Sequence, residues 1–238
     1  MTTPENGWSG RRRIVRFWFS AALCLALAAL AGPAAFIRPA WGDAPPVTGY
    51  TPVPADPSSP EAARLLRLWN SILERHSPRA AFCPDQSPMP SPILLQWKNL
   101  STLAPKLPRN EKLIYINGFF NRWMSEDDQK AYGRAEYWAL PEEFLRAGRG
   151  DCEDYAIIKY LALRYLAEPA QDMWLLLGKS LGRDSGHAVL AARDGSRVFI
   201  LDNLSRPAHL LIPEPQYLQS FIPFYAINEQ GIWRLTRP

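Results

Sequence analysis

Hydrophobic residues recur every three or four positions in the first part of the chain and later fall into short apolar runs between turn residues. The first pattern is typical of amphipathic helices and the second of strands. The helical pattern covers residues 60–76, 111–123, 141–147 and 152–168, and the strand pattern covers residues 173–177, 187–192, 197–201, 225–227 and 232–235. Helices followed by strands, without regular alternation, predict an α+β fold with N-terminal helices on an antiparallel sheet.

Residues 1–42 predict a targeting segment. Residues 11–16 hold four arginines, an apolar run follows over residues 17–36, and residues 40–42 offer a small-x-small cleavage site. This arrangement is typical of a secretory signal peptide and indicates a periplasmic protein. The alternative is a retained inner-membrane anchor, because about 20 apolar residues are long enough to span a bilayer.

The rest of the chain predicts a linker and one domain. Residues 43–60 are rich in proline, which indicates an extended linker, and residues 61–238 are long enough for one compact domain. The full sequence carries 27 basic and 23 acidic residues, of which five basic and one acidic lie in residues 1–42. The remaining charges therefore balance, and no nucleic-acid partner is expected.

The sequence Gly150-Asp151-Cys152-Glu153-Asp154 places a cysteine where a long predicted helix begins. Asp151 is a favourable N-cap, so Cys152 falls in the first turn, with Lys159 and Arg164 away from the apolar side of the helix. Free backbone N–H groups and the helix dipole favour the nucleophilic thiolate at that position. The flanking carboxylates disfavour it, which indicates that a protonated histidine or a bound cation compensates their charge.

A histidine and an aspartate are predicted to meet on the strands that follow. Asp194-Gly195 is a preferred pair for a two-residue hairpin turn. In that register the numbers of opposed residues add up to 389, and His187 lies opposite Asp202. Opposed Cβ atoms are about 4.5–5.5 Å apart, which lets an imidazole bond to a carboxylate. Cys152, His187 and Asp202 thus have the order of nucleophile, base and orienting acid in thiol enzymes.

Further motifs surround these residues, namely Asn117-Gly118-Phe119-Phe120-Asn121, Tyr137-Trp138-Ala139, Pro141-Glu142-Glu143-Phe144-Leu145, Gly186-His187-Ala188-Val189-Leu190 and Leu201-Asp202-Asn203-Leu204. Together with the cysteine motif, they resemble the bacterial transglutaminase-like cysteine peptidases from about residue 110 to the C-terminus. The resemblance implies a papain-like or transglutaminase-like fold and a cysteine endopeptidase that uses Cys152, His187 and Asp202.

The resemblance also implies a substrate, a partner and a regulator. The expected activity is calcium-dependent cleavage of a large surface adhesin near its N-terminus, after paired alanines, which controls detachment from biofilm. An inner-membrane receptor that senses cyclic di-GMP is the implied partner that sequesters the enzyme. Two alternatives stay open: a transglutaminase or cell-wall amidase with the same machinery, and a non-enzymatic calcium-binding module.

Asp151 and Glu153 are the predicted Ca²⁺ ligands. Acidic residues in a first helical turn are expected from the dipole alone, but three of them beside a thiolate exceed what capping requires. Carboxylate oxygens suit Ca²⁺, and the family uses Asp-Cys-Glu in this way. Backbone carbonyls near Asn117 or in residues 126–137 are expected to complete the shell, and Asp154 is assigned to the helix surface.

The remaining candidates have structural interpretations. His76 and His209 lack partners of the required kind and are predicted to be surface or packing residues. A disulfide between Cys83 and Cys152 is an alternative in an oxidising compartment, but it would leave the predicted histidine and aspartate without a role. Trp138 fits the core and the substrate groove equally well.

Overall fold

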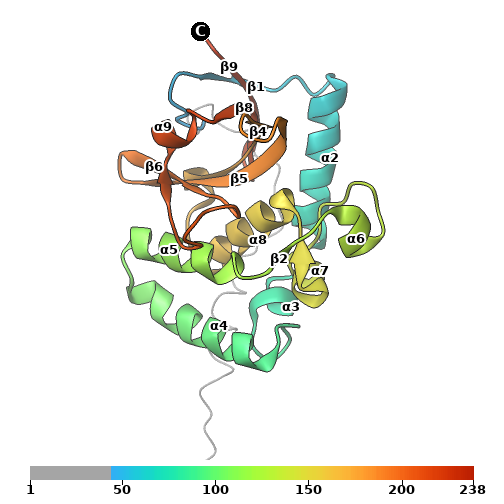
Figure 1. Cartoon of the computed structure of the whole chain (residues 1–238), viewed down its shortest axis with the longest axis vertical. Helices are drawn as coiled ribbons and strands as arrows, with labels where there is room; N and C mark the ends of the chain where they lie inside the picture. The colour runs from blue at the N-terminus through green and yellow to red at the C-terminus, as the bar shows by residue number, and fades with distance from the viewer. Residues whose placement is uncertain (1–43) are drawn as a thin grey trace, which may run out of the picture. The chain divides into compact units, whose positions relative to one another are not determined.

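The computed structural model describes residues 44–238, so the predicted targeting segment of residues 1–42 lies outside the described residues (Figure 1). A seven-stranded sheet in the order β1-β9-β8-β4-β5-β6-β7 carries the fold, and all its neighbouring strands are antiparallel. The strands are β1 (Thr51–Pro54), β4 (Met173–Ser180), β5 (Ser185–Asp194), β6 (Arg197–Leu201), β7 (Ile212–Pro213), β8 (Phe221–Asn228) and β9 (Gly231–Thr236).

Helices make up most of the described residues before β4. They are α2 (Pro60–Arg75), α3 (Pro78–Phe82), α4 (Ser91–Leu103), α5 (Arg109–Phe120), α6 (Asp128–Tyr132), α7 (Pro141–Ala147) and α8 (Cys152–Tyr165), with α9 (Glu214–Tyr217) between β7 and β8. Short elements complete the chain: η2 (Ala104–Lys106), η3 (Ala170–Asp172) and the parallel pair β2 (Met124–Ser125) and β3 (Arg149–Gly150). The predicted α+β fold is confirmed.

Two stretches that sequence patterns left without structure contain helices. Residues 77–108 are spaced by prolines, yet they hold α3 and α4, because a proline in the first helical turn replaces an N–H that has no partner there. Residues 126–133, which lie outside the predicted helices and strands, hold α6, which begins where the Asp127 carboxylate accepts a bond from Lys130 N at 3.0 Å. No helix of the described residues is long and apolar enough to cross a membrane.

Helix α8 is the centre of the larger core. Ten consecutive residues, 154–163, are buried, because α8 packs against β4 and β5 on one side and against α5 and α7 on the others. The N-terminal helix α2 closes another side: Trp69 meets the ring of Tyr160 edge-on at 5.2 Å and donates from Nε1 to Asn228 O at 2.9 Å. The start of α8 is therefore fixed by packing along the whole helix.

The structure corrects the predicted linker over residues 43–60. Within it, Thr51–Pro54 form edge strand β1, which pairs with β9 from Thr51↔Thr236 onward. Val47 is buried in the smaller core on the other face of the sheet, and Thr48 donates twice to Glu214, from N and Oγ1 at 2.8 Å each. The prolines do favour extended backbone, but that backbone is packed into the domain, which begins before residue 61.

The structure also corrects the predicted register of the β5–β6 hairpin. Asp194 pairs with Arg197, so Gly195 and Ser196 form the loop and paired residue numbers add up to 391. Gly195 has φ +60°, the left-handed value that the first loop position of such turns requires. His187 is therefore not directly opposite Asp202. A slip of two residues leaves every side chain on its predicted face, because strand side chains alternate with a period of two.

The bond between Glu214 and the N-terminal segment leads to the first prediction. Glu214 is only 1% exposed, so Glu214→Ala should lower the free energy of unfolding by about 2 kcal/mol through the loss of two charge-assisted hydrogen bonds. Urea denaturation measures the change. Asp85→Ala, which removes an exposed pairing with Arg79 at 3.8 Å, is the control and should cost less than about 0.5 kcal/mol. Equal losses in both variants would contradict a structural role for the Thr48–Glu214 contact.

Candidate active site

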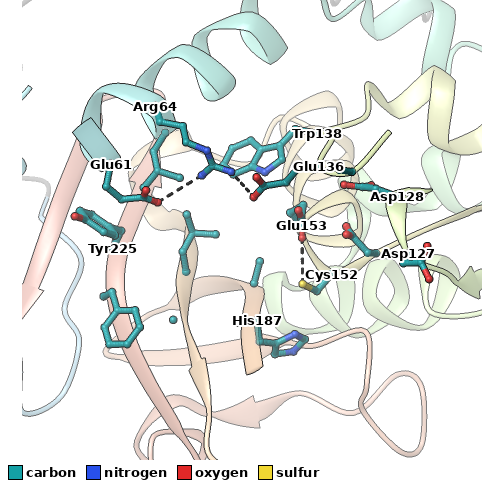
Figure 2. A pocket seen from close by; sticks show the side chains of 18 of the residues that line it. Glu61, Arg64, Asp127, Asp128, Glu136, Trp138, Cys152, Glu153, His187 and Tyr225 are labelled. Atoms are coloured by element: carbon teal, nitrogen blue, oxygen red, sulfur yellow. Dashed lines mark hydrogen bonds and ion pairs between the residues drawn. The ribbon is translucent and has the colours of Figure 1, made fainter. Parts of the chain in front are cut away.

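A cleft of about 1010 Å³ opens where the start of α8 meets β4 and β5 (Figure 2). Cys152 and His187 both line it, and in the view of Figure 2 the thiol of Cys152 lies between Glu153 and His187. The fold thus brings Cys152 and His187, which lie 35 positions apart in the sequence, to one wall of the cleft. Cys152 is a free thiol, so the alternative disulfide between Cys83 and Cys152 is not formed.

Cys152 begins α8, directly after the N-cap Asp151. Its position depends on Gly150, because a Cβ there would lie 2.4 Å from Asp154 Oδ2 and 2.8 Å from Phe144 Cδ2. The thiol donates to Glu153 Oε2 at 3.2 Å. Burial raises the pKa of Cys152, and the charges of Glu153 and Asp151 raise it further, against an opposing hydrogen bond from Ala188 N–H. Without a cation to compensate these charges, the surroundings of Cys152 therefore favour the thiol over the thiolate.

His187 and Asp202 form a hydrogen-bonded pair. His187 stands on β5 opposite Gly178 of β4, and its Nε2 lies 3.0 Å from Asp202 Oδ1. Both side chains are less than a tenth exposed, at 7% and 8%. Asp202 follows the last residue of β6, which lets its side chain reach His187 although the two are not directly opposed. Because Nε2 is engaged, Nδ1 is the ring nitrogen left for a bond to a thiol.

Two further donors hold the Asp202 carboxylate in its ionised form. Leu204 N donates to Oδ1 at 2.9 Å, and the hydroxyl of Tyr217 donates to Oδ2 at 3.0 Å. Burial tends to raise the pKa of Asp202, but the bonds from His187, Leu204 and Tyr217 outweigh it and lower the pKa. Tyr217 lies on α9, and no local pattern around it predicts that this short helix reaches the site.

Three carboxylates gather beside Cys152. One oxygen each from Asp128, Asp151 and Glu153 lies within 4.8 Å of the other two, an arrangement that can hold a metal ion. Asp128 Oδ1 and Asp151 Oδ1 are buried and have no hydrogen-bond partner. Burial and the nearby charge of Glu153 raise the pKa of both Asp128 and Asp151. The two predicted acids are thus joined by Asp128 from residues 126–137, where sequence reasoning expected a backbone carbonyl.

The assignment of Asp154 to the helix surface was wrong. Asp154 is 1% exposed, and its carboxylate accepts bonds from Ala139 N at 2.8 Å, Tyr132 Oη at 2.9 Å and Asp151 N at 3.4 Å. These donors come from the segment before α7, from α6 and from the start of α8. Asp154 therefore ties together the three segments that surround the acidic cluster, because α8 is covered on the side where a surface was expected.

The outer walls of the cleft come from elements far apart in sequence. Trp138 is only 5% exposed yet lines the cleft, so it belongs both to the core and to the groove. Phe224, which is 47% exposed, and Tyr225 of β8 also line the cleft. Arg64 of α2 forms an ion pair with Glu136, which joins the N-terminal helix to the loop before Trp138 (Figure 2).

The other two histidines lie away from the cleft lining. His209 is exposed and its Cβ lies against Gly118 on α5. His76 packs edge-on against Phe82 at 5.8 Å, with Nδ1 at 3.7 Å from Glu142 Oε2. Cys83 is fully buried. The residues set aside on sequence grounds thus take no part in the arrangement around Cys152.

Comparison with known proteins places this arrangement among cysteine peptidases. Residues 89–233, more than half of the chain, match the family model of the bacterial transglutaminase-like cysteine proteinases (BTLCP). No curated protein sequence gives a significant match.

Solved structures of Legionella pneumophila LapG are similar to this structure. At 26% sequence identity and a TM-score of 0.53, the match covers 71% of this chain and 87% of LapG. A calcium-bound LapG structure gives the same values, and an EGTA-treated one matches over 84% of its length. The match extends over most of LapG and supports the transglutaminase-like fold that the sequence predicted.

The contacts of Asp154 give the second prediction. Asp154→Ala should lower the free energy of unfolding by about 3 kcal/mol, because it leaves the buried N–H of Ala139 without an acceptor. Asp154→Asn should lose less, since its amide oxygen still accepts one bond. Denaturant titration followed by tryptophan fluorescence measures both. A loss below about 0.5 kcal/mol for the alanine variant, as is usual for surface positions, would return Asp154 to the helix surface.

Proposed function

The chain belongs to the bacterial transglutaminase-like cysteine proteinases, and on that basis we propose that it is a calcium-dependent periplasmic endopeptidase with Cys152, His187 and Asp202 as its catalytic triad. One observation carries the proposal: His187, which is bonded to Asp202, lines the same cleft as a free thiol at the start of a buried helix. A nucleophile, a base and an acid that orients the base are the parts that acyl transfer requires.

In the first half-reaction, Cys152 transfers its proton to His187 Nδ1 and attacks the carbonyl carbon of the scissile peptide bond. The bond of Asp202 to Nε2 fixes the tautomer that leaves Nδ1 free to accept and stabilises the imidazolium that forms. The imidazolium then protonates the leaving amine, which departs as the C–N bond breaks and leaves an acyl-enzyme. The backbone N–H of Cys152, in the first turn of α8, is the proposed donor to the oxyanion.

In the second half-reaction, His187 takes a proton from water, and the resulting hydroxide attacks the thioester. The C–S bond breaks, the acid product leaves, and the proton returns from His187 to the Cys152 sulfur. Both half-reactions require the cleft to admit a polypeptide on each side of Cys152. The distribution of its walls over α2, the loop before Trp138 and β8 is consistent with this requirement.

Ca²⁺ is the cation that the acidic cluster fits. Asp128, Asp151 and Glu153 offer carboxylate oxygens, the ligand type that Ca²⁺ prefers, and two of these residues have a buried oxygen that lacks a partner. The calcium-bound structure of LapG supports the same choice. When bound, the cation would compensate the negative charge beside Cys152 and hold α6 against the start of α8.

The proposed substrate is a large surface adhesin, cut near its N-terminus after paired alanines, so that cells detach from biofilm. This follows from the family resemblance of the motifs around Cys152, and the predicted signal segment supports the periplasm as the compartment. An inner-membrane receptor that senses cyclic di-GMP is the proposed partner that sequesters the enzyme.

The third prediction tests the triad. Cys152→Ala should abolish cleavage of an adhesin fragment that contains paired alanines, and Asp202→Asn should lower kcat by roughly 10⁴-fold, because an amide permits the wrong imidazole tautomer. Both variants should keep the wild-type fold by circular dichroism. Gel assays and mass spectrometry of the products measure the outcome.

His209→Ala is the matched control for His187→Ala and should keep wild-type activity, since His209 is exposed and does not line the cleft. Equal losses in the two histidine variants would contradict the assigned triad. Cross-linked products or cleaved cell-wall peptides, with an intact adhesin, would favour a transglutaminase or an amidase in place of the endopeptidase.

The fourth prediction concerns the cation. EGTA should lower both activity and Tm, because a ligand bound only by the folded state stabilises it by about 2.7 kcal/mol at a hundredfold excess over Kd. For a chain of this size the decrease in Tm is roughly 5–10 °C. Added Ca²⁺ should restore both, whereas Mg²⁺ should restore little, since it requires a tighter octahedral shell. Differential scanning fluorimetry and the cleavage assay measure the two effects.

A matched pair of neighbouring residues localises the effect. Asp128→Asn should reproduce the EGTA result, because it removes one charge from the cluster. Asp127→Asn should not: Asp127 lies outside the cluster, and asparagine remains a good cap for α6. Full activity and an unchanged Tm in EGTA would remove calcium from the proposed function.

A further inference from the structure

Lys159 is a fully buried lysine that the proposed chemistry does not use. It lies on α8 seven residues after Cys152, has no exposed surface, and donates from Nζ to the carbonyl oxygen of Leu201 at 3.3 Å. Leu201 is the last residue of β6 and directly precedes Asp202. The side chain thus connects the helix that begins at the thiol to the strand end that carries the acid.

A second polar side chain holds the next carbonyl. Asn121, which follows α5, donates from Nδ2 to Asp202 O and to Ala208 O, at 2.7 Å each. Consecutive backbone carbonyls, of Leu201 and Asp202, are therefore held by side chains from two different helices. The backbone of Asp202 lies in no strand, so these contacts replace the ladder bonds that fix residues within the sheet.

The burial of Lys159 has a cost that packing alone does not explain. Moving an ammonium group out of water is expensive unless an opposite charge is close, and no carboxylate of residues 44–238 forms an ion pair with Lys159. Burial lowers the pKa of Lys159 to about 7, and the charge of Asp202 acts in the opposite direction. A methionine would fill a similar volume without this cost.

We propose that Lys159 is a positioning residue for the His187–Asp202 pair, holding the end of β6 so that the Asp202 carboxylate faces His187. The inference rests on the proposed function, since it assigns Lys159 a role only through Asp202. The amine and the ammonium both carry N–H donors, so the contact with Leu201 O forms in either state. Lys159 does not line the cleft, and its effect is on the triad rather than on substrate binding.

The first test compares Lys159→Met with Arg164→Met. Both variants remove a cation from α8, but Arg164 bonds to Glu229 and lies away from the cleft lining. Lys159→Met should lower kcat by roughly a hundredfold with little change in KM, because a small displacement of a catalytic group has an effect of that size. Arg164→Met should keep the wild-type kcat. Rates are compared per folded molecule, as determined by circular dichroism.

A spectroscopic measurement separates positioning from general destabilisation. The ring N–H of His187 that bonds to Asp202 should give a low-field proton resonance, identified by its absence in His187→Ala. Lys159→Met should shift or broaden this resonance, and Arg164→Met should leave it in place. The rate of Cys152 alkylation by iodoacetamide gives a second measure that requires no substrate.

The decisive test is a double-mutant cycle with Asp202→Asn. If Lys159 acts through Asp202, the double variant should be no slower than Asp202→Asn alone, whereas independent roles would multiply the two losses. Multiplied losses, or a Lys159→Met variant with wild-type kcat and an unchanged His187 resonance, would overturn the inference. If Lys159→Met does not fold, Lys159→Gln, which is uncharged and too short to keep the contact, is measured against the same outcomes.

The same cycle distinguishes a failure of the proposed triad from a failure of the role of Lys159. An Asp202→Asn variant with full activity would refute the proposed triad. An inactive Asp202→Asn variant beside a fully active Lys159→Met variant would leave the triad intact and refute only the role of Lys159.

Discussion

The burial of α8 on every side is the constraint on which the rest of the structure depends. A helix that packs against a sheet and several other helices at once cannot slide or rotate without disturbing each interface, because protein interiors are close-packed. Its first residue, Cys152, is therefore held with the precision of the core although it faces a cleft. The same burial explains why the polar side chains of Asp154 and Lys159 on this helix form hydrogen bonds within the protein rather than with solvent.

Burial also sets the electrostatics of the cleft. Burial and the charge of Glu153 raise the pKa of Asp128, Asp151 and Cys152, which lie close together at the start of α8. On the other side of Cys152, Asp202 keeps its charge because three donors satisfy it. A carboxylate with satisfied hydrogen bonds thus holds His187 on one side of Cys152, and carboxylates with unpartnered oxygens that suit a cation lie on the other side (Figure 2). Asp202 and the acids of the cluster thus differ in whether hydrogen-bond donors of the protein satisfy them.

Local signals in the sequence predicted the parts of the site that depend on neighbours in the chain. The start of α8 at Cys152 followed from a good N-cap, and the pairing of His187 with Asp202 survived an error of two residues in the hairpin register, since the strand period is two. Contacts that require the assembled fold were missed. Asp128 reaches the cluster from a separate helix, and Lys159 was placed away from the apolar side because periodicity assumes that a helix has a solvent face.

The ion pair between Arg64 and Glu136 joins a cleft residue that lies before the match to the family model to one that lies within it. Arg64 and its neighbours on α2 precede residue 89, where the match to the family model begins, whereas Cys152, His187 and Asp202 lie within it. Cys152 and His187 thus lie within the match, whereas α2 contributes Glu61, Arg64 and Leu65 to the cleft lining from outside it. A substitution on α2 can therefore change the shape of the cleft without altering Cys152, His187 or Asp202.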